Sequence, residues 1–158
     1  MRKIIAIVLF LSLSLFAQKF TLQTLEGKKI SINNYEGNFI FEDDEYNKKN
    51  ILLFFFGTKC PYCINDIPEV NTLKDSNIKV IGIHAQYEIG DSALTSFIKT
   101  KGIKFDVLTY TEGDRLVDYL RRRDMWIGGV PYYVFIDPHG NLEPIELSKV
   151  KPKAHPSP

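Results

Sequence analysis

The stretch Ile51-Leu-Leu-Phe-Phe-Phe-Gly-Thr-Lys-Cys-Pro-Tyr-Cys63 decides the fold of this chain. Its first six residues are apolar on both faces, which predicts a buried strand in the centre of a sheet. A short turn follows, and we expect a helix to begin at Cys60. The amide groups and positive dipole end of a helix start favour the thiolate form of a cysteine placed there. Because Cys63 is close enough to reach back, the pair predicts a reversible dithiol–disulfide centre.

Two other interpretations of the cysteine pair stay open from the residues alone: half of a structural zinc site, and a passive disulfide. A structural zinc ion needs about four ligands. The chain has no other cysteine, and its histidines, His84, His139 and His155, are scattered without paired spacing. The strand–turn–helix setting favours redox chemistry and no bound metal.

Residues 1–17 have the pattern of a secretory signal. Arg2 and Lys3 precede an apolar run over residues 4–16, and Ala17 is a small residue suited to cleavage. The run is shorter than the roughly 20 residues that a membrane-spanning helix needs. An uncleaved N-terminal anchor is the alternative. Either form predicts a location in the periplasm or at the extracytoplasmic face of a membrane.

The rest of the chain suits a single domain, expected over residues 18–147. The formal net charge of the full chain, +1, gives no electrostatic argument for a nucleic-acid partner. Residues 148–158 are rich in proline and lysine, which predicts an irregular tail and leaves no room for a C-terminal helix.

Apolar periodicity predicts strands that alternate with helices, followed by a terminal hairpin. The sequence therefore predicts an α/β fold, with a central mixed sheet flanked by helices and an added N-terminal β-hairpin. We expect His84 to lie in a loop, Trp126 to pack as a core aromatic, and the acidic segment 34–50 to be irregular. The expected strands are 20–23, 29–32, 51–56, 78–83, 105–108, 132–136 and 142–147, and the helices begin near Cys60, Asp91 and Asp114.

A second motif, Gly128-Gly-Val-Pro131, leads into the expected strand 132–136. Together with the strand–CxxC–helix order, it resembles the thioredoxin superfamily. The opening Phe20-Thr-Leu-Gln-Thr-Leu-Glu-Gly-Lys-Lys-Ile-Ser-Ile32 resembles, more specifically, exported members of the TlpA/ResA/CcmG type. The likeness covers residues 19–147. It implies a thioredoxin-like fold, no bound cofactor, and a cis peptide bond at Val130–Pro131, with an ordinary trans bond as the alternative.

The resemblance also implies roles for three residues around the dithiol. Cys60 would be the attacking thiolate, and Cys63 would resolve the mixed disulfide. Asp66, one helical turn after Cys63, matches an acidic position of ResA-like proteins and would accept a proton from Cys63. A solvent-facing Asp66 is the alternative. Phe54 stands where ordinary thioredoxins carry a buried aspartate, which favours the ResA-like arrangement.

Substrate contacts are expected from two segments. Val130 and Pro131 would offer backbone groups for strand-like pairing with a substrate chain, and Pro61 and Tyr62 would lie exposed beside Cys60. Lys59 replaces the tryptophan that is usual before the first cysteine. Its cation would favour the Cys60 thiolate, unless its charge simply sits in water.

The sequence thus predicts an exported thiol–disulfide oxidoreductase that exchanges electrons with cysteines of protein substrates. By family likeness, we favour a reductant acting in cytochrome c maturation, supplied by a membrane electron-transfer partner of the DsbD/CcdA kind. The Pro61-Tyr62 pair is also close to that of exported oxidants, so an oxidant of folding proteins is the first alternative. A copper chaperone of the SCO kind, using His139 as a further ligand, is the second.

Overall fold

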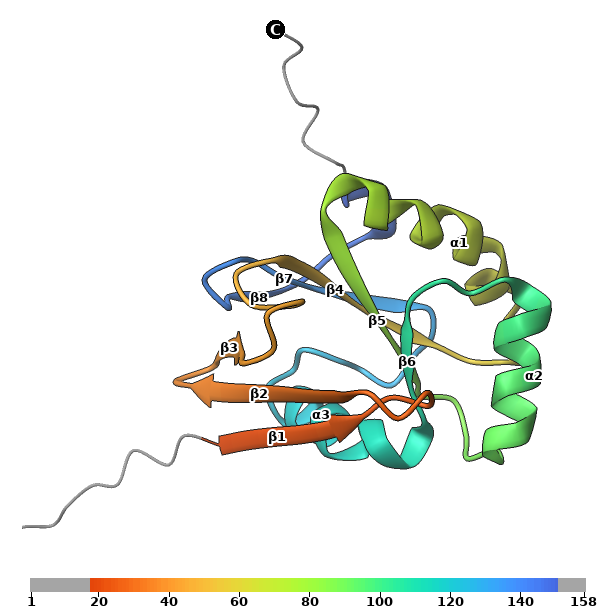
Figure 1. Ribbon diagram of the computed structural model, residues 1–158, viewed down its shortest axis with the longest axis horizontal. Helices are drawn as coiled ribbons and strands as arrows, with labels where there is room; N and C mark the ends of the chain where they lie inside the picture. The colour runs from red at the N-terminus through yellow and green to blue at the C-terminus, as the bar shows by residue number, and fades with distance from the viewer. Residues whose placement is uncertain (1–17, 151–158) are drawn as a thin grey trace, which may run out of the picture.

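The computed structural model describes residues 18–150, and its centre is a five-stranded mixed sheet (Figure 1). The strand order is β6-β5-β4-β7-β8. The first three of these strands run parallel, whereas β7 runs antiparallel to β4 and β8 antiparallel to β7. The bounds are β4 Asn50–Phe56, β5 Ile78–His84, β6 Asp106–Leu108, β7 Tyr132–Ile136 and β8 Leu142–Pro144. The expected mixed central sheet is confirmed.

Strand β4 organises two apolar cores because its side chains alternate between the faces of the sheet. Ile51, Leu53 and Phe55 point into one core, and Leu52 and Phe54 point into the other. All of them are fully buried, as the continuous apolar run requires. The strand therefore holds the sheet between two apolar layers and ends directly at the cysteine motif.

Helices cover both faces of this sheet (Figure 1). Helices α1 (Pro61–Thr72) and α2 (Asp91–Lys101) pack on the face that holds Leu52 and Phe54, while α3 (Tyr110–Arg122) packs on the opposite face. A short 3-10 turn, η1 (Leu73–Ser76), extends α1.

A second, three-stranded antiparallel sheet lies beside α3 (Figure 1). The expected hairpin is present as β1 (Gln18–Gln23) and β2 (Lys29–Tyr35). The prediction of an irregular segment over 34–50 is wrong in part, since β3 (Asn38–Phe41) pairs with β2. Phe39 and Phe41 alternate with exposed residues and enter the core, so burial of two aromatic rings outweighs the acidic residues that follow.

No α-helix follows β8 within the described residues, which end at Val150. A 3-10 turn, η2 (Leu147–Lys149), takes the place of a terminal helix. Leu147 and Val150 are buried in the same core as Leu52 and Phe54. The C-terminal segment therefore helps α1 and α2 to cover this face of the sheet.

Both predicted terminal segments extend beyond the structure. Residues 1–17 and 151–158 lie outside the described residues, so the signal sequence and most of the tail stay predictions. Within residues 18–150, no helix has the length and apolar character needed to cross a membrane.

His84 lies at the end of β5 and not in a loop, which corrects the sequence-based placement. Only 1% of it is exposed, and neither ring nitrogen has a hydrogen-bond partner in the described part of the chain. The rings of Phe56 and Tyr87 flank it at 5.6 and 5.7 Å between centroids. Burial lowers the pKa of His84 from its ordinary 6.5, because the charged imidazolium loses its water there.

We expect acid to destabilise the fold through His84. The unfolded chain takes up this proton first, so stability is full above about pH 6.5 and falls below it, by up to about 1.4 kcal/mol per pH unit. Urea unfolding at a series of pH values measures this slope. His84→Phe should flatten it, whereas His139→Gln, at an exposed site, should not. Equal slopes in the wild type and His84→Phe would mean that His84 is not the group whose protonation destabilises the fold.

Candidate active site

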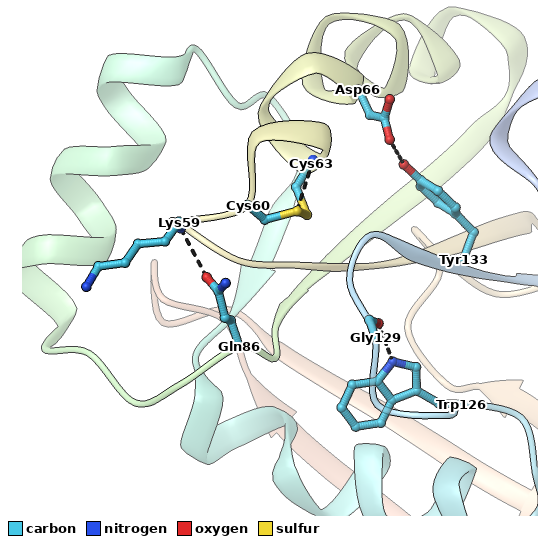
Figure 2. The surroundings of a disulfide bond; sticks show 8 residues. All are labelled: Lys59, Cys60, Cys63, Asp66, Gln86, Trp126, Gly129 and Tyr133. Carbon is cyan, nitrogen blue, oxygen red and sulfur yellow. Dashed lines mark hydrogen bonds between the residues drawn. A yellow bond between two sulfur atoms is a disulfide. The ribbon is translucent and has the colours of Figure 1, made fainter.

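Cys60 and Cys63 form a disulfide at the start of α1 (Figure 2). Cys60 is the N-cap residue of the helix, and Pro61 occupies its first turn. The Cys63 N–H donates a hydrogen bond to the Cys60 sulfur at 3.1 Å. Cys60 retains 5% exposure and Cys63 retains none. The helix start that the sequence predicted at Cys60 is therefore confirmed.

This geometry gives the two sulfurs unequal chemistry. In the reduced form, an amide donor and the positive end of the α1 dipole would stabilise a thiolate on Cys60. The first turn of α1 carries no acidic residue that would oppose this effect. Cys63 is sealed behind Cys60, so an approaching molecule meets Cys60 first.

The turn before the dithiol is braced by the residues that follow β5. The Lys59 N–H donates to the Gln86 side-chain oxygen at 3.0 Å (Figure 2), and the hydroxyls of Thr58 and Tyr87 are hydrogen-bonded at 2.9 Å. A Cβ on Gly57 would lie 2.2 Å from that same Gln86 oxygen, so the close approach requires glycine. The sequence did not indicate these contacts, although the parallel register of β4 and β5 brings the two segments together.

The Lys59 side chain extends away from the sulfur atoms in Figure 2. Its ammonium lies 5.1 Å from the centroid of the Tyr87 ring, a cation–π contact. Although Lys59 and Cys60 are adjacent in the sequence, the ammonium therefore does not lie beside the Cys60 sulfur, and any effect of its charge would act over a longer distance. The proposed tuning of the thiolate stays a prediction.

Asp66 is half-buried on α1 and points toward Tyr133 on β7 (Figure 2). The Tyr133 hydroxyl donates a hydrogen bond to a carboxylate oxygen of Asp66 at 2.5 Å. Within residues 18–150, no hydrogen bond joins Asp66 to Cys63 in this disulfide form. The half-buried side chain is thus held toward β7 by its bond to Tyr133. Its role as a proton acceptor stays a prediction.

The Val130–Pro131 peptide bond is cis, as the resemblance implied. Val130 packs against the apolar core that contains both cysteines. The loop before it is fixed by Trp126, whose indole N–H donates to the Gly129 carbonyl at 2.9 Å (Figure 2). Trp126 is only 4% exposed and stacks on Phe55, which confirms it as a core aromatic.

Exposed apolar side chains flank the dithiol in the sequence. Pro61 is exposed, and Tyr62, between the cysteines, is 74% exposed. Ile127, in the loop that leads to Val130, is 84% exposed. Tyr62 and Ile127 are the two most exposed large apolar side chains in the described residues. Their place beside the cysteine and Val-Pro motifs makes them candidates for contact with a substrate.

Among residues 18–150, no cluster of three or more histidine, cysteine, aspartate or glutamate side chains could hold a metal ion. His139 is exposed in the turn after β7, where its backbone N–H donates to Asp137 at 2.8 Å. The dithiol is therefore the chemical centre to compare with those of known proteins.

Sequence comparison relates the chain to a known family and to curated proteins. Residues 15–145 match the model of the AhpC/TSA family. The thiol-disulfide oxidoreductase ResA of Bacillus thuringiensis subsp. konkukian is 29% identical over 107 residues, which are 65% of this chain and 54% of that protein. The chain thus spans about half the length of this curated relative.

Solved structures agree on the fold. StoA from Bacillus subtilis superposes with a TM-score of 0.58 at 18% identity, covering 86% of this chain and 96% of that one. A secreted Mycobacterium tuberculosis disulfide oxidoreductase, homologous to Escherichia coli DsbE, superposes with a TM-score of 0.55 at 22% identity, covering 80% and 81%. The matched family model, with the CxxC disulfide and cis-proline on a mixed sheet, shows that the chain is a thioredoxin-like member of the AhpC/TSA family.

Proposed function

We propose that this protein is a thiol–disulfide oxidoreductase that acts on cysteines of protein substrates. One observation carries the proposal: a disulfide at a helix start whose first sulfur is the more accessible and whose second is buried behind it. A passive disulfide needs neither the helix start nor this order of exposure. The name of the ResA relatives supports the same activity.

The reaction is a pair of thiol–disulfide exchanges. In the reducing direction, the Cys60 thiolate attacks a substrate disulfide, one substrate thiolate leaves, and a mixed disulfide forms. Cys63 then loses its proton to Asp66 and attacks the Cys60 sulfur, which releases the second substrate thiolate. The substrate gains two electrons, and the protein is left with the disulfide seen here.

We propose further that the protein works as an exported reductant, with cytochrome c maturation as the favoured process. The signal-like residues 1–17 and the secreted Mycobacterium tuberculosis neighbour support export. The resemblance of residues 20–32 to the TlpA/ResA/CcmG type, together with the ResA relatives, favours the reducing role. An exported reductant must be re-reduced from across the membrane, so a DsbD/CcdA-like electron-transfer protein is the partner that this role requires.

Reduction of a protein disulfide tests the activity. The protein with intact cysteines, kept reduced by dithiothreitol, should accelerate the cleavage of the interchain disulfides of insulin, followed by precipitation of the free chains. A rate of insulin reduction equal to that of dithiothreitol alone would exclude the proposed function.

We expect Tyr62→Ser to weaken the binding of protein substrates. Removing an exposed aromatic contact beside Cys60 should raise KM about threefold to tenfold, which corresponds to about 1 kcal/mol of lost apolar contact. The value of kcat should change little, since Tyr62 takes no part in the exchange. Tyr35→Ser is the matched control, because Tyr35 is 53% exposed on β2. An unchanged KM in Tyr62→Ser would exclude this contact.

A further inference from the structure

Tyr133 is a buried polar residue that the exchange steps above leave without a role. It is 6% exposed and belongs to the same apolar core as Cys60 and Cys63. Its hydroxyl donates to Asp66 at 2.5 Å, across the space between β7 and α1 (Figure 2). The residue therefore links the central sheet to the one carboxylate that the proposed mechanism uses.

The central sheet holds the Tyr133 ring in place. Its backbone is paired with Phe54 of β4, and the two rings are stacked at 5.1 Å with an interplanar angle of 6°. On the other side, the Ile145 N–H donates to the Tyr133 carbonyl at 3.1 Å. Because the backbone is bonded on both sides and the ring is stacked on that of Phe54, the hydroxyl is a donor at a defined point.

We propose that Tyr133 is a positioning residue for proton transfer: it binds one carboxylate oxygen of Asp66, so that the other oxygen is free to take the proton of Cys63. The inference rests on the proposed function, since it assigns a part in the resolving step. Without the hydroxyl, Asp66 would lose the hydrogen bond that fixes its orientation.

The electrostatics around Tyr133 and Asp66 fit these roles, in which Tyr133 donates a hydrogen bond and Asp66 accepts it. Burial and the bonded Asp66 carboxylate raise the pKa of Tyr133 well above its ordinary value, so the hydroxyl stays a donor at every working pH. Glu69, also on α1, acts in the same direction. The charged groups of two other segments of the domain already have partners. Glu146 and Lys149 of the C-terminal segment pair with each other at 3.4 Å, and the Lys59 ammonium lies over Tyr87.

The resolving step can be isolated with an aryl disulfide, dithiobis-nitrobenzoate, which needs no protein substrate. Cys60 attacks it, one coloured nitrobenzene thiolate leaves, and a mixed disulfide forms on Cys60. Cys63 passes its proton to Asp66 and attacks Cys60, and the second coloured thiolate leaves as the Cys60–Cys63 disulfide forms. The second release reports resolution alone.

We expect Tyr133→Phe to slow this second release about threefold to tenfold near neutral pH, and to change its pH–rate profile. The first release should not change. Tyr132→Phe is the matched control, because that neighbouring side chain contacts Phe55 on the opposite face of β4. Identical profiles for Tyr133→Phe and the wild type would overturn the inference.

A double variant separates positioning from a general structural effect. If Tyr133 acts through Asp66, then Tyr133→Phe should have no further effect on resolution in an Asp66→Asn background. An equal slowing in both backgrounds would assign it a packing role and reject the inference. The insulin assay fails if the proposed function is wrong, whereas the nitrobenzoate profile fails only if Tyr133 is misassigned.

Discussion

Replacing Cys60 by serine is expected to abolish disulfide exchange. A serine hydroxyl is a far poorer nucleophile than a thiolate at neutral pH, and the one cysteine that remains, Cys63, is fully buried. Insulin reduction should fall to the rate of the chemical reductant alone. The fold should survive, because serine also caps a helix N-terminus well and keeps an acceptor for the Cys63 N–H.

Cys63→Ser provides the matched control. Cys60 remains able to attack, but the mixed disulfide cannot be resolved, so a covalent complex with the substrate should accumulate and disappear when a thiol is added. Turnover by Cys60→Ser, or a stable complex formed by that variant in place of Cys63→Ser, would reverse the assignment of the two cysteines.

Phe54→Ala is expected to destabilise the domain by about 3–5 kcal/mol, the usual cost of removing a buried aromatic ring. Phe54 is fully buried on the central strand and contacts the rings of Phe56, Phe105 and Tyr133. Strand β4 has partners on both sides, so the cavity cannot easily collapse. Urea unfolding measures the change in the free energy of unfolding.

Tyr35→Ala is the control for this prediction, because its side chain is 53% exposed. Its effect should stay within about 0.5 kcal/mol. A loss of less than about 1 kcal/mol in Phe54→Ala would mean that the ring is not a fixed part of the core. The stack that holds Tyr133 would then lose its physical basis as well.

Local patterns in the sequence predicted the centre of the fold well. The apolar run from Ile51 is a buried strand, and the helix begins at Cys60. The family resemblance correctly implied the cis peptide bond before Pro131. The error over β3 has a physical reason: the strand has only four residues, the exposed Ile40 between Phe39 and Phe41 hides the alternation, and an acidic run follows at once. His84 was misplaced because a polar residue at the end of a strand normally marks a loop.

Contacts between distant segments could not be predicted from the sequence. Asp66 and Tyr133 are 67 residues apart, and only the packing of α1 on the sheet brings them together. The same is true of Lys59, whose place over the Tyr87 ring depends on how β4 and β5 align. A single sequence shows which side chains could do chemistry, and the fold decides which of them meet.

The reduction potential of the Cys60–Cys63 pair tests the proposed role most directly. Protein that carries both cysteines is equilibrated against a series of thiol–disulfide buffers, and the fraction of free thiol is measured at each. We predict one reversible two-electron transition near the thioredoxin value of about −270 mV. A value near about −120 mV, typical of a strong disulfide donor, would contradict the role of a reductant.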